Sequence, residues 1–391
     1  MPKPHVRVVE LDILRAVAII IIVVSHLSFF LPTVIPDFTV GSYAQVFVTY
    51  LGVALFLFIS GFVLYLNHPS FSQRGELTDF FKKRVLRIFP LYWLSIALVF
   101  VVGRPLADLA TRGNTLIVVL GLQGFLSPRF GTGIMTGWLF IGVILVLYTI
   151  YPLIIALASD VKLPARIDSD VLKFALMLIV PFLILAVAHF AFSIISGDVF
   201  IFYGIFVLGV AISKYDVLGK YGFLTDNRTK LLKNVAVAAV SFTAFLFIYT
   251  LSLQPANASA VSRFASYFSF VMTNALFLLF ALLTFCLVRL VVVSFSKASR
   301  PLSRAVWYRA LLLISFSSYA IYLFFTTILI QFMHALLVTP LTALEIDIVQ
   351  IFVGLPTVVL IGFVLQSTQN EILNKIRKYR AASSPSSDSN E

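Results

Sequence analysis

The sequence predicts an all-α polytopic membrane protein with about ten transmembrane helices and both termini in the cytoplasm. Three observations support this fold class: 60% of the 391 residues are hydrophobic, only 12% are charged, and the mean hydropathy is +1.02. A soluble chain of this length carries about a quarter charged residues and divides into two or more domains. A water-soluble fold could not bury so much apolar surface, whereas a lipid bilayer accommodates it.

Ten apolar stretches are long enough, or nearly so, to cross a bilayer core of about 30 Å as helices. They comprise residues 13–33, 43–66, 88–103, 138–158, 171–193, 199–213, 233–253, 266–293, 309–337 and 347–366. The sixth is short, so either Lys214 must extend to the interface or part of 193–198 must be helical. A weaker stretch, 114–126, is interrupted by Gly121 and Gly124, and we expect it to lie at the interface or to re-enter from one side.

The distribution of basic residues predicts the orientation. Clusters of Lys and Arg occupy 67–87, 214–232, 294–308 and the chain end beyond residue 374. Three of the alternate connections, 34–42, 254–265 and 338–346, carry one basic residue, Arg263, between them, and 104–137 is predicted to be the largest outer loop. Because basic connections stay in the cytoplasm, ten helices with a cytoplasmic start place all four clusters on that side. An eleventh span at 114–126 would move one cluster outside, which argues against it.

This arrangement predicts one transmembrane domain over residues 1–380 and a disordered cytoplasmic tail over 381–391. In a soluble protein the net charge of +12 would favour nucleic acid as a partner. Here the charge follows the membrane topology, so the predicted partner is the lipid bilayer and no nucleic acid is expected. The single cysteine, Cys286, excludes a disulfide framework. No His, Cys or carboxylate pair has metal-ligand spacing, so no metal is expected.

Ionisable residues at membrane depth are costly and mark functional candidates, and the first helix carries the strongest set. Asp12 and Arg15 are three residues apart and can pair on one face. Arg15 and His26 are eleven residues apart, which places them within about 20° of one face and about 16 Å apart along the axis. This pattern suits a long substrate with an anionic head and a reactive far end. Alternatively, His26 bonds a neighbouring helix and Arg15 only reaches the interface.

A second candidate is the arginine pair Arg84 and Arg87 at the start of the third predicted helix. Two arginines three residues apart share a helix face and could grip phosphate groups. Basic residues before a membrane helix also serve as topology signals and bind lipid headgroups, so both interpretations remain open.

Two further segments carry small or polar side chains inside apolar helices. Ser60 and Gly61 in the second helix permit close helix approach, which is the simpler interpretation of this pair. Tyr319 and Tyr322 in the ninth helix, with three nearby serines, indicate a polar lining. Serines in such helices often bond back to their own carbonyl groups, which is the alternative.

Taken in order, these segments resemble the integral-membrane acyltransferase-3 family, which acylates sugars, polysaccharides and lipid-linked carbohydrates. Residues 11–19, Leu-Asp-Ile-Leu-Arg-Ala-Val-Ala-Ile, are similar to the opening of the family's first helix, and ten residues separate Arg15 from His26 as in the family. Similar later segments are Phe-Ile-Ser-Gly-Phe at 58–62, Arg84-x-x-Arg87 before Pro90 and Tyr92, Tyr148 and Pro152 after Trp138, and Ser-Tyr-Ala-Ile-Tyr-Leu at 318–323.

The resemblance implies a multi-pass cell-membrane O-acyltransferase, transferring groups other than amino-acyl groups, that modifies carbohydrate of the cell envelope. It implies that His26 is the catalytic imidazole and that the arginine pair helps to hold the acyl donor. We therefore assign catalysis to His26, Arg15 and Asp12. The residues assigned to donor binding are Arg84, Arg87, Ser60, Gly61, Tyr319 and Tyr322.

Two positions depart from the family pattern. Many members have Glu after the Trp of the fourth helix, where this chain is apolar from Leu139 to Leu147. Many also have His shortly after the Tyr-Leu of the ninth helix, where this chain has Phe324 and Phe325. Both departures remove polar groups that could orient an acceptor.

The predicted reaction moves an acyl group, expected to be acetyl, from acyl-coenzyme A to a hydroxyl of a sugar, polysaccharide or glycolipid. Acyl-coenzyme A would be a co-substrate, and no permanently bound cofactor is expected. His26 would act as general base, or carry the acyl group as an acyl-His intermediate. The alternatives are a transporter or flippase that moves a glycolipid without acyl chemistry, and a sensor that only binds the donor.

Overall fold

The computed structural model describes residues 9–31, 43–71, 73, 75–101, 115–130, 139–158, 169–252, 261–296 and 305–383. Within these residues the chain forms helices and no strands. Nine helices in the described part are long and apolar enough to cross a membrane. The 22-residue helix α1 (Val9–Phe30) is not among the nine, yet its length of about 33 Å also matches a bilayer core. The predicted all-α polytopic membrane fold is confirmed.

The long helices correspond one by one to the ten predicted spans. After α1 they are α2 (Tyr43–Asn67), α3 (Glu76–Val101), α7 (Leu139–Ala158), α8 (Ser169–Phe190), α9 (Gly197–Lys214), α11 (Arg228–Ser252), α12 (Val261–Ser296), α13 (Val306–Leu337) and α15 (Leu355–Ser383). The short α9 ends on Lys214, whose ammonium group donates to the carbonyl of Ala158. The last helix continues to Ser383, and residues 384–391 of the predicted tail lie outside the described residues.

Five short elements lie between the long helices. They are α5 (Thr115–Val119), α6 (Gln123–Phe130), α10 (Val217–Lys220), α14 (Ala343–Val349) and a π-helical turn (Gln350–Gly354). With five and eight residues, α5 and α6 are too short to span, in agreement with the prediction for 114–126. Gly121 has a φ of +70°, which permits the turn between them.

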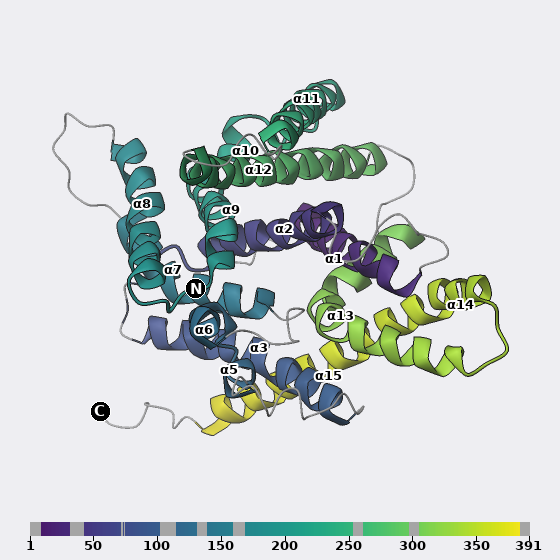
Figure 1. The fold of residues 1–391 in the computed structure, drawn as a ribbon. Helices are drawn as coiled ribbons and strands as arrows, with labels where there is room; N and C mark the ends of the chain where they lie inside the picture. The colour runs from purple at the N-terminus through teal and green to yellow at the C-terminus, as the bar shows by residue number, and fades with distance from the viewer. Residues whose placement is uncertain are drawn as a thin grey trace.

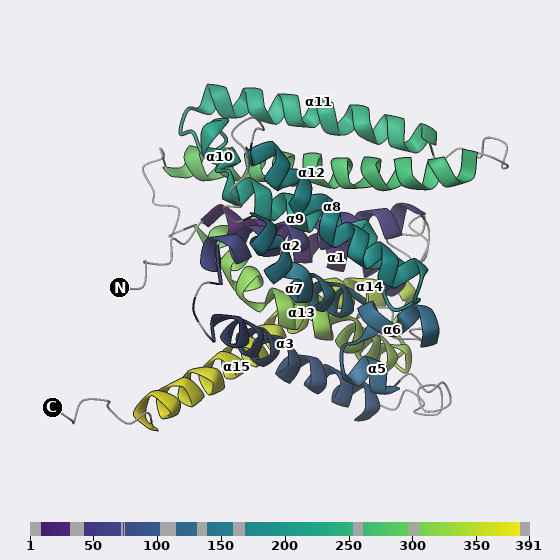
Figure 2. The same cartoon turned by 90° about the vertical axis from the view of Figure 1, so that its left-hand side faces the viewer.

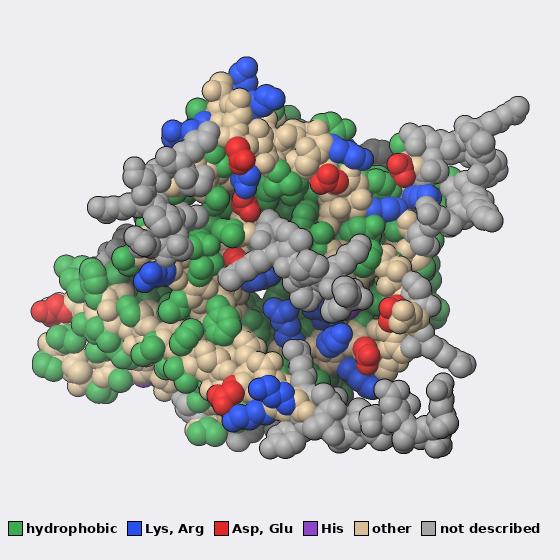
Figure 3. All heavy atoms as spheres, turned by 180° about the vertical axis from the view of Figure 1, so that it is seen from behind, with side chains coloured by type: hydrophobic (Ala, Val, Ile, Leu, Met, Phe, Trp, Pro, Cys, Tyr) green, Lys and Arg blue, Asp and Glu red, His purple; other side chains and the backbone are tan. Residues whose placement is uncertain are grey.

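The short elements show where the two ends of the bundle lie. In Figure 2, α10 and the last turns of α15 lie on the left, whereas α5, α6 and α14 lie on the right. The left end, which carries the basic segments 67–87 and 214–232, is called the basic end below, and the right end the opposite end. Figure 3 looks onto the basic end, where Lys and Arg side chains surround the middle of the face. The basic segments 67–87 and 214–232 therefore lie at one end and the non-basic connection 338–346 at the other, whereas residues 34–42, 254–260 and 297–304 of the predicted connections lie outside the described residues.

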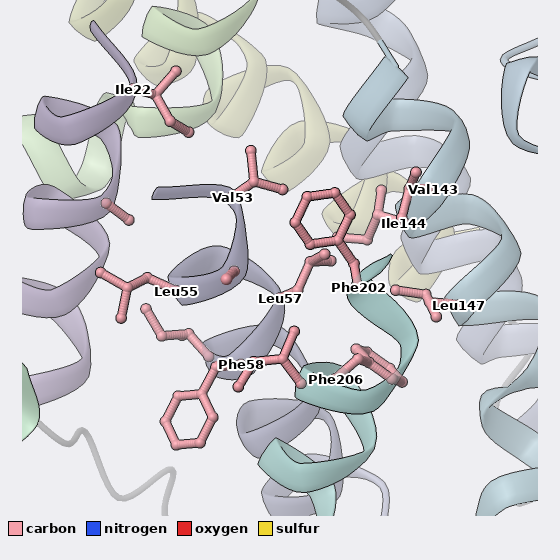
Figure 4. Close-up of a cluster of buried hydrophobic side chains, with 14 of the residues drawn as sticks. Ile22, Val53, Leu55, Leu57, Phe58, Val143, Ile144, Leu147, Phe202 and Phe206 are labelled. Atoms are coloured by element: carbon pink, nitrogen blue, oxygen red, sulfur yellow. The ribbon is translucent and has the colours of Figure 1, made fainter. Parts of the chain in front are cut away.

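The centre of the bundle is built around α1 and α2. Figure 1 shows α11 and α12 along one edge, α13 and α15 along the other, and α1 and α2 between them. Against α2 lies α9, and the close-up in Figure 4 shows the buried apolar cluster to which Phe58 of α2 and Phe206 of α9 belong. Close approach is possible because Gly61 and Gly209 face the partner helix; a Cβ atom at either would collide with a carbonyl oxygen across the contact.

A network of charged side chains ties the start of α1 to α12. The guanidinium of Arg289 donates to the carboxylate of Glu10, and its Nη2 atom lies 2.7 Å from Asp226 and 3.0 Å from the carbonyl oxygen of Leu224. Glu10 is only 4% exposed, so the ion pair compensates a buried charge. The first turn of α1, which leads into Asp12, is held in place by this network.

One helix boundary differs from the prediction by a large margin. The third helix begins at Glu76, twelve residues before the predicted start at 88, so Arg84 and Arg87 lie inside α3 and not in a connection. Glu76 and Asp79 lie in the first turn, where negative charge stabilises the helix dipole. The buried ring of Phe80 packs against four aromatic neighbours and His68, which supports this charged part of the helix.

Candidate functional site

The arginine-bearing part of α3 is fixed from α15, because Pro90 interrupts the helical hydrogen bonds. Proline has no backbone N–H, so the carbonyl of Leu86 loses its helical donor. Gln369 replaces that donor: its Nε2 atom lies 3.2 Å from the carbonyl oxygen of Leu86 and 3.0 Å from that of Arg87. The break in α3 is thus satisfied by a neighbouring helix, which locates Arg87 relative to the bundle.

A cavity of about 120 Å³ lies between α1, α2, α3, α7 and α13. Six of the nine residues predicted for the site line it. The full lining comprises Arg15, Phe56, Ser60, Val63, Leu64, Arg84, Arg87, Ile88, Phe140, Ile141, Ile144, Tyr148, Ser318, Tyr319 and Tyr322. The hydroxyl of Tyr319 donates to the carbonyl oxygen of Ile88 at 2.7 Å and so joins α13 to α3 beside the arginines.

The three arginines give the cavity a positive charge. Asp12 partly offsets it, since its Oδ1 atom lies 3.5 Å from Nη1 of Arg15. The guanidinium of Arg84 lies 5.3 Å from the ring centroids of both Phe80 and Tyr148, and its buried Nε atom has no hydrogen-bond partner among the described residues. No carboxylate contributes to the lining that the structure describes. These features fit a ligand with phosphate or carboxylate groups.

The positive field extends to the rim of the cavity at the basic end. Arg87 is exposed and repels Arg15 electrostatically. Outside the membrane spans, burial lowers the pKa of His68, and the charges of Arg84 and Lys83 lower it further. Like charges held this close together are unfavourable without a counter-charge, so an anion bound here would be stabilised.

The predicted catalytic residue His26 lies on α1, half-buried between α2 and α13. Its Nδ1 atom lies 2.7 Å from the carbonyl oxygen of Ile22 and 3.2 Å from Oγ of Ser25, which in turn lies 2.8 Å from Oγ1 of Thr49. The imidazole and the ring of Phe325 form a T-shaped contact, with 5.4 Å between the centroids. Because a carbonyl oxygen only accepts, Nδ1 carries the proton and Nε2 keeps its lone pair. The imidazole is therefore arranged as a proton acceptor.

His26 is not among the side chains that line the cavity. Its neighbour Phe325 follows the lining residue Tyr322 by three positions on α13, so the imidazole lies about one helical turn beyond the cavity. The structure brings the arginines, Ser60 and the two tyrosines together, and it places the imidazole next to that group but outside it.

A comparison with protein families decides the class of the protein. The family model described as "Acyltransferase domain" matches residues 8–366, which include every residue of the cavity lining and His26. The chain belongs to the integral-membrane acyltransferase-3 family. Searches of curated proteins and of solved structures found no significant match. The protein is thus a multi-pass membrane acyltransferase.

The remaining predicted residues of this acyltransferase have other surroundings. Gly61 faces α9, against the backbone of Phe206, and does not line the cavity. Asp12 pairs with Arg15 but does not line the cavity either. Trp138 lies outside the described residues. Phe324 and Phe325, which occupy the region where the family resemblance led us to expect a His, are both buried.

Sequence reasoning missed three residues that shape the acyltransferase site. Phe56 and Phe140 line the cavity, but no local pattern distinguishes them among 39 phenylalanines. Gln369, which fixes α3, lies beyond the predicted end of the last span. Its polar side chain, three residues after Gln366, was the signal that could have identified it, since buried amides in membrane helices require partners.

Proposed function

We propose that this membrane acyltransferase transfers an acyl group, expected to be acetyl, from acyl-coenzyme A to a hydroxyl of a sugar, polysaccharide or glycolipid. The observation that carries the proposal is the cavity with three arginines and no lining carboxylate among the described residues. Coenzyme A combines anionic phosphates with a long, uncharged pantetheine arm, and this combination matches a cavity with arginines at its mouth and uncharged side chains beyond them.

The donor would bind with its phosphates on Arg84 and Arg87, assisted by Arg15. Guanidinium groups contact phosphate oxygens in pairs, and the orphan Nε of Arg84 offers such a donor. The pantetheine arm would extend into the cavity. On α2 the lining runs from Leu64 to Phe56, and eight residues of helix correspond to about 12 Å of depth.

His26 would then act as general base through Nε2. It takes the proton from the acceptor hydroxyl while the hydroxyl oxygen attacks the thioester carbonyl; the carbon–sulfur bond breaks, and the proton passes to the leaving thiolate. Ser60 lines the cavity and is suited to stabilise the oxyanion. The proton of Tyr319 is engaged with Ile88, and the phenol of Tyr322 is hydrogen-bonded with the backbone of Phe140. In the covalent variant the imidazole itself attacks and carries the acyl group before the acceptor arrives.

The test follows label from acetyl-coenzyme A into carbohydrate or lipid in membranes that contain the wild type, His26→Ala or His189→Ala. His189 is the matched control, because its Nδ1 atom also bonds a backbone carbonyl, that of Ile195, at 2.6 Å. We expect transfer by the wild type and His189→Ala and loss of transfer by His26→Ala. Transfer by His26→Ala at the wild-type rate would remove His26 from the mechanism. If the wild-type protein is folded but no carbohydrate or lipid becomes labelled, the alternative of a transporter without acyl chemistry is favoured.

A further inference from the structure

Three aromatic rings close the cavity at the end away from the arginines. They are Phe56 of α2, Phe140 of α7 and Tyr322 of α13, and on each helix the ring is the lining residue farthest from the basic end. Phe140 contacts both others: its centroid lies 6.0 Å from that of Phe56 and 5.4 Å from that of Tyr322. We call these three residues the aromatic floor.

The aromatic floor lies between the cavity and His26. Tyr322 belongs to the floor, and Phe325, which forms the T-shaped contact with the imidazole, follows it on α13 after about one turn. A donor that enters from the arginine side therefore meets the floor before its acyl group reaches the imidazole. The floor would have to part by rotation of at least one ring.

We infer that Phe56, Phe140 and Tyr322 determine which acyl groups are transferred, restricting the donor to short, unbranched ones. The inference rests on the proposed function, because it concerns the acyl end of the same donor. Membrane-protein helices pack at close to crystal density, so each added methylene must displace these rings further. The restriction is on length and bulk, since the floor offers apolar ring faces and a single phenol.

Phe140 is the best position for a test because its ring joins the other two. Shortening it removes both contacts within the floor and opens space along the path to His26. Phe89 provides the matched control: it is a half-buried phenylalanine of α3 whose ring contacts Tyr92 and Trp93, and it does not line the cavity. Phe140→Leu serves as a second variant that keeps more of the packed volume in case Phe140→Ala is unstable.

The experiment uses purified full-length protein in lipid nanodiscs with acetyl-, butyryl-, hexanoyl- and octanoyl-coenzyme A. The acceptor is the carbohydrate or lipid fraction that takes up label in the membrane assay described above. Release of free coenzyme A gives kcat/KM for each donor, and the binding affinity of each donor is measured separately. For the wild type and Phe89→Ala we expect kcat/KM to fall about tenfold or more from acetyl to hexanoyl. For Phe140→Ala and Phe140→Leu we expect the ratio of hexanoyl to acetyl to rise about tenfold or more.

Two results would overturn the inference while leaving the proposed function intact: equal use of acetyl and hexanoyl donors by the wild type, or an unchanged ratio in both folded Phe140 variants. If the wild type binds the donors but releases no coenzyme A, the proposed chemistry fails. The affinities then decide the inference, which requires that the Phe140 variants gain affinity for hexanoyl- relative to acetyl-coenzyme A. If the wild type binds none of the donors, both proposals fail.

Discussion

The Nδ1 atom of His26 lies 2.7 Å from the carbonyl oxygen of Ile22, one helical turn earlier on α1. This contact determines which ring nitrogen is basic, because a carbonyl oxygen can only accept the proton of Nδ1. Ser25 donates to the same carbonyl at 2.8 Å and contacts Thr49 of α2. The imidazole is therefore oriented from both α1 and α2, as expected of a general base whose tautomer is set by its second nitrogen.

The first prediction separates chemistry from binding at His26. In His26→Gln the side chain can still bond Ile22 but offers no basic nitrogen, so kcat should fall on the order of 10²–10⁴-fold. Affinity for acyl-coenzyme A should stay within about twofold of the wild type, because His26 does not line the donor cavity. Kinetics and equilibrium binding on the same preparation check both parts. A larger loss of kcat favours the acyl-His route, and a parallel loss of affinity contradicts the placement of His26 outside the donor site.

The second prediction concerns Arg84, whose Nε atom is buried without a partner in the described structure. Hydrogen bonds to charged groups contribute about 1.5–3 kcal/mol, so Arg84→Gln should weaken coenzyme A binding by about 10- to 100-fold. Arg84→Lys should restore only part of this, because an ammonium lacks the planar fork. Titration calorimetry measures both, with Lys82→Gln as the control, since Lys82 is exposed and outside the lining.

A matched ligand sharpens the test of Arg84. Pantetheine has the arm of coenzyme A but none of its phosphates, so its affinity should be the same for the wild type and Arg84→Gln. If both ligands lose affinity equally, Arg84 supports the shape of the cavity and does not bind phosphate.

The third prediction uses two adjacent residues of α2 that face different ways. Ser60 lines the cavity, whereas Gly61 faces the backbone of α9. Ser60→Ala should change kcat or donor affinity and leave the melting temperature within about a degree. Gly61→Ala should destabilise the protein by about 1–3 kcal/mol through overpacking. Thermal unfolding in detergent and measurements of donor binding distinguish the two variants. If Gly61→Ala weakened donor binding and left the melting temperature unchanged, Gly61 would act on the ligand and not on helix packing.

Much of the fold follows from the sequence because apolar length alone identifies membrane helices. Even α9, with 18 residues, is recognisable, since Lys214 can reach past the apolar run to a backbone carbonyl. The early start of α3 could not be predicted in this way. Half of residues 76–87 are charged, and their helix depends on contacts of Phe80 with rings that come from α7 and from the segment between α2 and α3.

The site was predictable where a residue is unusual for its surroundings. Arg15, Arg84 and Tyr319 stand out because charged and hydroxyl groups are rare at membrane depth. Phe140 could not be identified, because its importance comes from its position at the far end of a cavity and not from its type. Its role depends on the packing of three helices, which no local pattern encodes.

The fourth prediction tests the support that α15 gives to α3. Gln369→Leu removes the donor to the carbonyls of Leu86 and Arg87 and leaves that of Leu86, which has no helical donor because of Pro90, short of a hydrogen bond. The loss should cost about 1–3 kcal/mol of stability and weaken coenzyme A binding, because Arg87 loses its fixed position. Thr368→Ala is the control, since Thr368 is exposed and its hydroxyl bonds only within its own helix. Unchanged donor affinity in folded Gln369→Leu would contradict a link between the break in α3 and the arginine site.

The fifth prediction follows from the lowered pKa of His68 at the basic end. Its ordinary value is 6.5, and burial together with the charges of Arg84 and Lys83 brings it below that in the folded state. Between the lowered pKa and 6.5 the unfolded chain binds more protons, so the stability of the protein should decrease as the pH falls through this window. His68→Gln should remove this part of the pH dependence, which melting temperatures between pH 7.5 and 5 would measure.

Bound coenzyme A should change the same profile. Phosphates at Arg84 would offset the charge of Arg84 and raise the pKa of His68, so saturating coenzyme A should flatten the wild-type profile. Parallel profiles for the wild type and His68→Gln would show that other groups control the acid response.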